Sequence, residues 1–556
     1  MMIKTVSIFL MASLVFQSVK AQSYPKHYFR HPLNIPMQLV ANFGELRTNH
    51  WHMGLDIRTQ QKVNLKVFAA AEGYVSRVVV EPGGFGQAIY INHPNGYTTL
   101  YAHMNAFFPA LQDYVKKQQY ATESWKVDLQ LAPDQFPVDK GQYIGLSGST
   151  GGSQGPHVHF EIRDTKTDKV LNPLLFKFPI PDAVPPSVTR LAMYDRNKST
   201  YMQAPQLLNI QKTKNSIIRV GSNKISFAIG AVDRFTGTPN PNGVYLAKLS
   251  VDGNPVSSFT LDQIDYNETR YMNGHIDYPY AAKGGAQLQH ISPLPGATEI
   301  AYDTYGGDGV VHLQDGEVHD VLIEVQDANF NTTRIAFKVQ YDGALTPASY
   351  TGSEQFLPNN LNVFERENFQ LVTTEKTMYD AVNVVYNVVE NQAANSVSQQ
   401  HSFLSAAIPS HDFITVRILP SQPIAEEWKE RVVIRNTSGT KTFVQKATWQ
   451  KGWLMAKFRQ FGNYQAFIDN EPPTVYLATT NLSKASRIVF TPKDNFNSIK
   501  SFRAELDGQW LRFTNDKGKT WIYSFDEKFP RGEHQLKIFV EDEAGNVTTK
   551  VWNVRR

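Results

Sequence analysis

The sequence predicts a mainly β protein. An N-terminal antiparallel β groove domain with a helical insertion is expected to precede about three β-sandwich (Ig-like) modules. Three observations support this prediction. The 556 residues exceed what one hydrophobic core can organise. Short runs of β-branched and aromatic residues recur between Gly-, Pro- and Asn-containing turns. Hydrophobic residues make up 41% and charged residues 19%, which is typical of a folded globular chain.

The first 21 residues have the pattern of a secretory signal peptide. Lys4 supplies a positive charge, the apolar run 6–16 follows, and Ala21 offers a small residue for cleavage. The alternative interpretation is a buried N-terminal helix. The apolar run is too short to span a bilayer, and no later run is long enough, so no transmembrane segment is expected. The sequence therefore predicts an exported protein, periplasmic or extracellular, that begins near Gln22.

Composition narrows the chemistry. The chain has no cysteine, which excludes disulfides, thiolate zinc ligands and a cysteine nucleophile. Lys and Arg total 55 against 51 for Asp and Glu, a balance too even to favour nucleic acid as a partner. Any metal site must therefore be built from His, Asp or Glu.

A proline-rich joint at residues 178–187 ends the first domain. We expect domains at 22–180, 181–341, 342–470 and 471–556, after the signal peptide. Within the first domain, residues 107–131 are rich in Gln, Lys, Leu and Glu, which indicates a helical insertion. Of the 15 histidines, those that precede the joint are His27, His31, His50, His52, His93, His103, His157 and His159.

The second and fourth of these domains share a weak internal repeat. In each copy a Pro-Pro pair comes first, then an Asp two residues before a Phe, an Asp-Gly turn, and an Asp four residues before an Asn. The copies are Pro185-Pro186, Asp233, Asp252-Gly253 and Asp327 with Asn331, and Pro472-Pro473, Asp494, Asp507-Gly508 and Asp542 with Asn546. Asp-Gly between alternating strands is a strong hairpin signal.

Two short motifs carry the chemistry. In the His52-Met-Gly-Leu-Asp56 motif, the two ligand-type side chains share a face whether the segment is extended or helical. In the strand-like motif His157-Val-His159, both histidines project to one side. Catalytic zinc needs three protein ligands and an open position, and these motifs provide enough donors without cysteine. A neighbouring histidine, with His103 as another candidate, is suited to the proton transfer.

The arrangement of these motifs resembles peptidase family M23, of the lysostaphin/LytM type. The resemblance covers about residues 43–164, including HMGLD (52–56), AAAEGYVSRV (69–78), GGFGQAIYINHPNGYTTLYAH (83–103) and VDKGQYIGLSGSTGGSQGPHVHFEIR (138–163). It implies that His52, Asp56 and His159 bind Zn²⁺ and that His103 and His157 are catalytic. None of the five is substituted, whereas relatives that only activate other hydrolases have lost ligands.

By resemblance, the expected activity is endopeptidase cleavage of the peptide cross-bridges of bacterial peptidoglycan. Two bonds remain open, D-alanyl–diaminopimelate and a glycine bridge. Tyr101, Asn105 and Phe85 are expected to line the substrate groove, although simple β packing explains them equally well. The C-terminal β modules are candidate docking surfaces for envelope protein partners.

The sequence allows three alternatives. A non-catalytic peptidoglycan-binding or hydrolase-activating protein would not need the five intact residues. A peptidase of secreted proteins would use the same site. Gly151-Gly-Ser153-Gln-Gly155 matches the serine hydrolase pattern, but a strand rather than a helix is expected after it.

Overall fold

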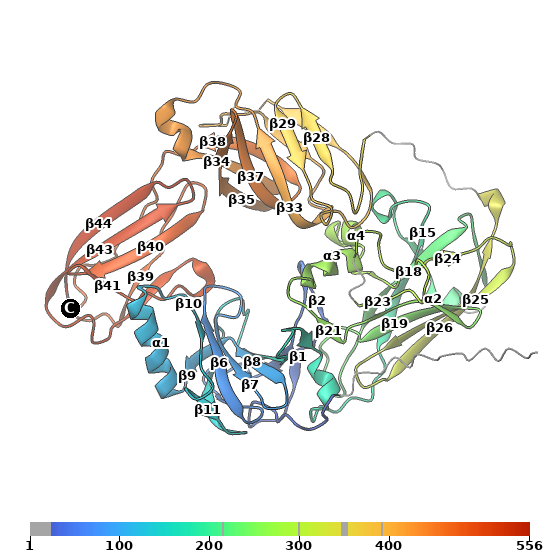
Figure 1. Ribbon diagram of the computed structural model, residues 1–556, viewed down its shortest axis with the longest axis horizontal. Coiled ribbons are helices and arrows are strands. Elements are labelled where there is room, and N and C mark those ends of the chain that lie inside the picture. Colours follow the sequence, from blue (N-terminus) through green and yellow to red (C-terminus); the bar gives the residue numbers. More distant parts are fainter. Residues whose placement is uncertain (1–23, 214–215, 298–300, 346–353, 391–392) are drawn as a thin grey trace, which may run out of the picture.

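The computed structural model describes residues 24–213, 216–297, 301–345, 354–390 and 393–556. The expected signal peptide, residues 1–21, lies outside this described part. Figure 1 shows four β-rich bodies arranged as a ring, with the blue N-terminal body next to the red C-terminal one. Across the described ranges, no helix combines the length and apolar character needed to cross a bilayer. The mainly β fold class is confirmed.

The first body is built on an antiparallel sheet with the main strand order β1-β4-β13-β8-β7-β6-β10. Its strands are β1 Leu39–Ala41, β4 Leu55–Arg58, β6 Gly73–Val80, β7 Gln87–Asn92, β8 Tyr97–Ala102, β10 Val127–Gln130, β11 Pro137–Val138, β13 His157–Asp164 and β14 Val170–Leu171. Shorter pairs and sheets use β2 Leu46–Arg47, β3 His50–Trp51, β5 Lys66–Phe68, β9 Met104–Phe107 and β12 Tyr143–Ser147.

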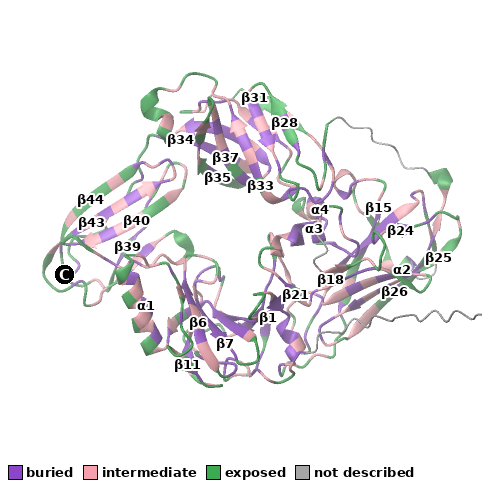
Figure 2. Cartoon of the chain, viewed as in Figure 1, coloured by how far each residue is buried: buried purple, intermediate pink, exposed green. Residues whose placement is uncertain are grey.

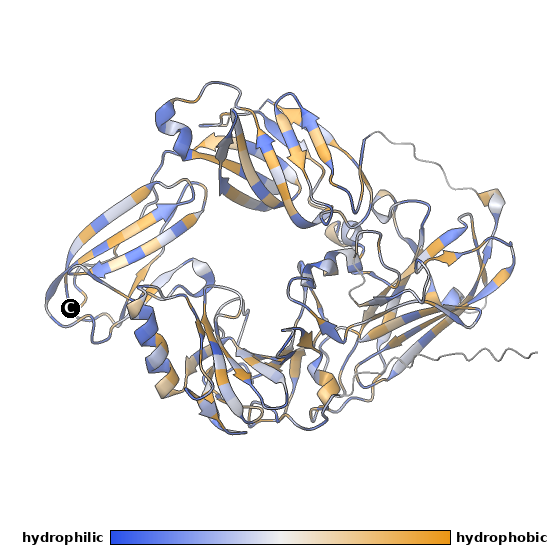
Figure 3. Cartoon of the chain, in the orientation of Figure 1, coloured by the Kyte–Doolittle hydropathy of each residue, from blue (hydrophilic) through white to orange (hydrophobic). Residues whose placement is uncertain are grey.

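The central strands β7 and β8 are buried over most of their length, as Figure 2 shows in purple. Such near-continuous burial explains the apolar run in β7, and in β8 the buried hydroxyls of Thr98 and Thr99 are satisfied by hydrogen bonds to Asn92 and Tyr101. Figure 3 shows the corresponding hydrophobic residues concentrated on the strands. Val78, Ile89 and Phe160 are 0% exposed and belong to one cluster that forms the core under the site. This rigid sheet therefore provides the platform for β13 and β4.

The helical insertion is shorter than predicted. Helix α1 spans Pro109–Ala121, with proline in its first turn, where a missing N–H costs nothing. Leu111, Val115 and Gln119 recur every four residues and are its buried face. The helix stops before Glu123, which has a positive φ of 48°. Residues 127–130 then form β10, which pairs with β6, because sheet pairing overrides the helix propensity of this segment.

The second body contains two facing sheets, ordered β16-β15-β18-β22 and β17-β26-β25-β19-β20-β23. Its elements are β15 Ser187–Asp195, β16 Gln206–Leu208, α2 Ile210–Thr213, β17 Ile217–Val220, β18 Lys224–Val232, β19 Leu246–Val251, β20 Asn254–Thr260, β21 Gln263–Ile264, α3 Met272–His275, α4 Tyr278–Ala282, β22 Gln289–His290, β23 Tyr302–Asp303, β24 Val311–His312, β25 Val318–Gln326 and β26 Thr332–Tyr341. Strand β21 pairs with β14, so the second body extends the sheet of the first.

The third body has sheets ordered β28-β29-β33-β37-β36 and β31-β32-β38-β34-β35. Its strands are β27 Gln355–Phe356, β28 Val363–Arg366, β29 Phe369–Val372, β30 Val382–Asn383, β31 Tyr386–Val389, β32 Gln400–Phe403, β33 Pro409–Ile418, β34 Val432–Ser438, β35 Lys441–Lys446, β36 Thr448–Gln450, β37 Trp453–Gln460 and β38 Gly462–Ile468. The fourth body consists of β39 Arg487–Phe490, β40 Ile499–Leu506, β41 Gln509–Trp510, β42 Trp521–Ser524, β43 Glu533–Asp542 and β44 Val547–Arg555.

The predicted repeat is visible in matching hairpins. Asp252-Gly253 joins β19 to β20, and Asp507-Gly508 joins β40 to β41. The backbone φ is positive at all four residues, at 49° and 79° in the first turn and 50° and 83° in the second. This is the geometry that favours Asp-Gly in two-residue hairpins. Both predicted hairpins are confirmed.

The ring closes where the fourth body meets α1 (Figure 1). Lys116 lies 3.0 Å from a carboxylate oxygen of Asp526. Arg503 pairs with Glu123 at 2.6 Å. The rings of Tyr120 and Trp510 meet edge to face with centroids 5.4 Å apart. The end of the chain is thus in contact with the domain that carries the candidate site.

Candidate metal centre

Three predicted ligands converge on one point. His159 on β13 lies directly opposite Asp56 on β4 in the antiparallel register, and His52 precedes β4. Asp56 Oδ1 is 3.0 Å from His52 Nε2 and 2.9 Å from His159 Nδ1. The two histidine nitrogens are 3.1 Å apart. A cation with bonds of about 2.0–2.1 Å separates tetrahedral ligands by about 3.3 Å, so a small outward adjustment would accommodate zinc.

Gly54 makes this convergence possible. A Cβ at this position would lie 2.6 Å from the carbonyl oxygen of Phe160 and 3.0 Å from His159 Cε1. Any other residue would therefore push β4 away from β13 and separate the ligands.

Backbone and carboxylate partners orient both histidine ligands. His52 Nδ1 donates to the carbonyl oxygen of Asn42 at 2.7 Å, which leaves Nε2 directed at the centre. His159 Nε2 donates to Glu161 Oε1 at 2.9 Å, which leaves Nδ1 directed there. Carboxylate–histidine pairs of this kind fix ring orientation and increase the basicity of metal-ligating histidines. The donor set and its orientation therefore fit zinc.

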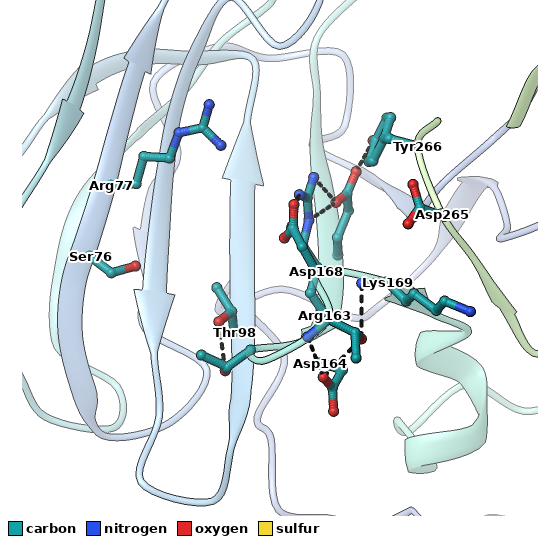
Figure 4. Close-up of polar contacts among 12 residues, drawn as sticks. Ser76, Arg77, Thr98, Arg163, Asp164, Asp168, Lys169, Asp265 and Tyr266 are labelled. Atoms are coloured by element: carbon teal, nitrogen blue, oxygen red, sulfur yellow. Dashed lines mark hydrogen bonds and ion pairs between the residues drawn. The ribbon is translucent and has the colours of Figure 1, made fainter. Parts of the chain in front are cut away.

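Glu161 is the centre of a buried polar group that the sequence analysis did not assign. Its side chain is fully buried and also accepts from Arg163, at 2.7 Å from Nη2, and from the hydroxyl of Tyr266. Figure 4 shows Tyr266, on a segment of the second body, pointing toward the carboxylate that Arg163 also contacts. Period-two spacing on β13 places Glu161 on the face of His159, a signal that could have identified it. No local signal identifies Tyr266, which is 105 residues from Glu161.

The two predicted catalytic histidines lie beside the metal ligands. His103 Nδ1 donates to the carbonyl oxygen of Thr150 at 2.8 Å, and His157 Nδ1 donates to that of Gly155 at 2.8 Å. Both Nε2 atoms are therefore free of these bonds, and that of His157 lies 3.3 Å from Asp56 Oδ1. The two ring centroids are 4.8 Å apart. His103 also has a positive φ of 60° at the turn between β8 and β9.

The electrostatics suit metal binding and proton transfer. Burial opposes the ionised form of Asp56, but the His52 ring and the hydrogen bonds with His157 and His159 outweigh it and hold the pKa of Asp56 well below its usual value. Burial also opposes the charge on His159, yet the bonds with Asp56 and Glu161 raise its pKa to about 9, so metal binding has to displace a proton. Burial, followed by the His159 and His157 rings, lowers the pKa of His103 to about 3, which leaves the ring neutral near pH 7.

A groove of about 920 Å³ runs over the centre, and its walls include Tyr266 and Gln287 of the second body. Phe85 lines this groove, with its ring centroid 5.9 Å from that of Tyr266. Tyr101 is instead fully buried in the core, and its hydroxyl accepts from the Ala70 N–H at 2.7 Å. Tyr101 is therefore a residue of the β-sheet core and does not line the groove. Asn105 is exposed on β9, outside the residues that line the groove.

The glycine-rich loop 149–155 forms one edge of the groove, and the fourth body holds it. Lys517 Nζ donates to the carbonyl oxygens of Ser149, Gly151 and Ser153 at 3.1, 3.1 and 2.6 Å. Asp516 accepts from the Gly151 N–H at 2.6 Å. Since no helix follows Ser153, the serine hydrolase geometry is absent from this loop.

Known proteins are similar in sequence to the region that carries this centre. Residues 50–127 and 126–173 match the model of peptidase family M23, and residues 353–469 match that of a Zu5-like domain. The DD-carboxypeptidase/endopeptidase Mpg of Neisseria meningitidis is 31% identical over 160 residues, or 29% of this chain and 28% of that protein. The peptidoglycan DD-endopeptidase ShyA of Vibrio cholerae is 24% identical over 188 residues, or 33% of this chain and 37% of that protein.

A solved structure, the catalytic domain of lysostaphin from Staphylococcus simulans, aligns with 24% of this chain and 87% of its own length, at 23% identity and a TM-score of 0.17. The chain spans 28% of the length of Mpg and 37% of that of ShyA, so the likeness to these curated relatives is limited to about a third of each protein.

Proposed function

We propose that this chain is a zinc endopeptidase that hydrolyses peptide cross-links of peptidoglycan, because residues 50–127 and 126–173 match the model of peptidase family M23. The observation that carries the proposal is the convergence of His52, Asp56 and His159 within 4.8 Å of one another, with His103 and His157 beside them. The D-alanyl–diaminopimelate bond is the proposed target. Support for this choice comes from Mpg and ShyA, whose names describe DD-endopeptidases. An exported, periplasmic location follows from the substrate.

His52, Asp56 and His159 would hold the zinc ion through Nε2, Oδ1 and Nδ1. Zinc at this position supplies Lewis-acid polarisation of the scissile carbonyl and increases the acidity of water. Of the pair His103 and His157, one neutral ring accepts the proton of the attacking water at Nε2, and the other, protonated at both nitrogens, donates a hydrogen bond from Nε2 to the developing oxyanion. Their Nδ1 bonds to backbone carbonyls fix both rings for these roles.

The groove supplies the orientation of the substrate. Phe85 and Tyr266 offer apolar ring surface on one side of the centre, and the glycine-rich loop presents backbone on the other. A peptide bound between them places its scissile bond over the ligands. This positioning converts the attack of water into an effectively intramolecular step.

The test is digestion of purified muropeptides of defined cross-link by the mature protein, with and without a chelator. We expect cleavage of D-alanyl–diaminopimelate cross-links that stops on chelation and returns with zinc. His159→Ala should lose zinc and turnover together. His103→Ala should retain zinc and lose about a hundred- to a thousand-fold in rate. His312→Ala, an exposed histidine of the second body, is the control and should change neither. A zinc-loaded protein that leaves every cross-link intact would contradict the proposal.

A further inference from the structure

Two groups of three aspartates lie outside the peptidase site, one in each of the two copies of the internal repeat. The first contains Asp182, Asp233 and Asp327, and the second contains Asp469, Asp494 and Asp542. In each group, one carboxylate oxygen of every residue lies within 4.8 Å of the others. We propose that each group binds one Ca²⁺ ion and that these ions fix the second body to the first and the fourth body to the third.

The position of each aspartate in its body is the same in both groups. Asp182 and Asp469 lie in the joints that lead into the second and fourth bodies. Asp233 follows β18 directly, and Asp494 lies in the loop after β39. Asp327 follows β25 directly, and Asp542 ends β43. Each group therefore connects a joint to two loops at one end of a β body.

An asparagine supports each group in the same way. Asn331 donates from Nδ2 to Asp327 Oδ2 at 2.7 Å and to the backbone carbonyl of Asp182 at 3.4 Å. Asn546 donates from Nδ2 to Asp542 Oδ2 at 2.8 Å and to the carbonyl of Asp469 at 2.9 Å. The two bodies are distant in sequence but share this arrangement, so the geometry is a property of the repeat rather than of one loop.

A buried carboxylate without a partner points to a missing cation. Asp233 is 1% exposed, and its Oδ1 atom has no hydrogen-bond partner. Asp494 Oδ1 is also buried without a partner. Within the described residues, no Lys, Arg or His forms an ion pair with any of the six aspartates. Other oxygens of these groups accept N–H donors, as Asp494 Oδ2 does from Phe496 and Ser498, but a buried carboxylate oxygen that is left without a partner is destabilised, and metal coordination removes this cost.

The pKa shifts agree with this geometry. Burial, and then the neighbouring Asp182 and Asp327 carboxylates, raise the pKa of Asp233 to about 7. Burial also raises the pKa of Asp469 and of Asp494, with Asp542 contributing to both. Each group thus carries repulsion between like charges that a divalent cation would convert into attraction.

The donor chemistry favours calcium. All the ligand-type atoms are oxygens, which selects hard cations over zinc or copper. Ca²⁺ binds oxygens at about 2.3–2.6 Å, so two of its ligands can lie anywhere up to about 5 Å apart, and carboxylate oxygens within 4.8 Å of one another can share such an ion. Backbone carbonyls and water can complete the six to eight positions that Ca²⁺ requires. Mg²⁺ demands a near-ideal octahedron and usually keeps several waters, whereas Ca²⁺ accepts irregular sets of protein oxygens such as carboxylates gathered from a joint and two loops.

The test uses the full-length, zinc-loaded protein in calorimetric titration with CaCl₂, and thermal unfolding in parallel. We expect two bound Ca²⁺ per chain and a rise in Tm on addition of Ca²⁺. Asp233→Asn and Asp494→Asn should each lose one bound ion, and the double variant should lose both. Because each substitution also relieves charge repulsion, the calcium-free variants should be as stable as the calcium-free parent or more so, which separates lost binding from failure to fold.

Matched controls come from the same repeat. Asp252→Asn and Asp507→Asn alter exposed hairpin aspartates, which already pair with His319 and His534 at 2.7 Å. Both controls should retain two ions. The proposal would be overturned by an absence of calcium binding, or by binding that survives the Asp233→Asn, Asp494→Asn double substitution. An equal or larger Tm shift with Mg²⁺ would overturn the assignment to calcium.

Discussion

Lys517→Ala should loosen the glycine-rich loop at the edge of the candidate site. The lysine Nζ donates to three carbonyl oxygens of this loop, at 2.6–3.1 Å. A hydrogen bond from a charged donor contributes about 1.5–3 kcal/mol. Lys517 is exposed, so solvent screening reduces the value and we take the lower limit of about 1.5 kcal/mol. This loss corresponds to about a tenfold increase in the population of the open loop.

Hydrogen exchange measured by mass spectrometry reads this population directly. Amides of residues 149–153 should exchange about tenfold faster in Lys517→Ala. Turnover of a cross-linked muropeptide should fall as well, because Ser153 lies 3.2 Å from His157 Nδ1 and moves with the loop. Lys519→Ala removes the same charge from an exposed residue two positions away and is the control. Equal exchange in the two variants would refute the role of Lys517.

Three further predictions follow from the site and the carboxylate groups. Glu161→Gln should lower zinc affinity about 10- to 100-fold, because a neutral amide is a weaker acceptor for the His159 N–H. Competition with a chromophoric chelator measures this affinity. An unchanged affinity would contradict a role of Glu161 in zinc binding. Tyr266→Phe removes one donor to the same carboxylate, so it should lower zinc affinity less than Glu161→Gln does, and a larger loss would contradict this order. In calcium-free buffer, the stability of the parent protein relative to that of Asp233→Asn should fall as pH rises from about 4 to 7. Burial and the Asp182 and Asp327 carboxylates raise the pKa of Asp233 to about 7, and Arg234 offsets this rise only in part. Between these pH values the folded state therefore retains a proton that the unfolded chain releases. Ca²⁺ should raise the Tm more at pH 8, where Asp233 is ionised, than at pH 5. A larger rise at pH 5 would contradict the raised pKa of Asp233.

The ligand geometry could be predicted from sequence because its determinants are local. His157 and His159 share one face of a strand, and His52 and Asp56 lie within one short segment, so each motif specifies its own geometry. That the two motifs share one metal ion was implied by the resemblance to peptidase family M23, because neither motif indicates that β4 pairs with β13. The repeat likewise indicated matching hairpins, because Asp-Gly fixes the backbone of a turn.

What could not be predicted depends on contacts between distant parts of the chain. Tyr266 and Lys517 reach the site from other bodies, and neither lies in a motif that indicates a partner. Tyr101 could not be assigned from its neighbours, since burial depends on which face of β8 meets the core. The aspartates of the repeat were visible as a spacing, but their convergence depends on how the joints fold back onto the bodies.

Contact between the fourth body and the glycine-rich loop has a consequence for how the protein matures. Ribosomes complete the N-terminal domain first, and its zinc ligands and histidines are all in place early. The lysine that holds the loop is made last, almost 370 residues later. A nascent chain, or one cut between the third and fourth bodies, therefore has all the zinc ligands and candidate catalytic histidines, but its glycine-rich loop lacks the hydrogen bonds from Lys517. The activity of a truncated N-terminal fragment would thus be a poor measure of the finished molecule.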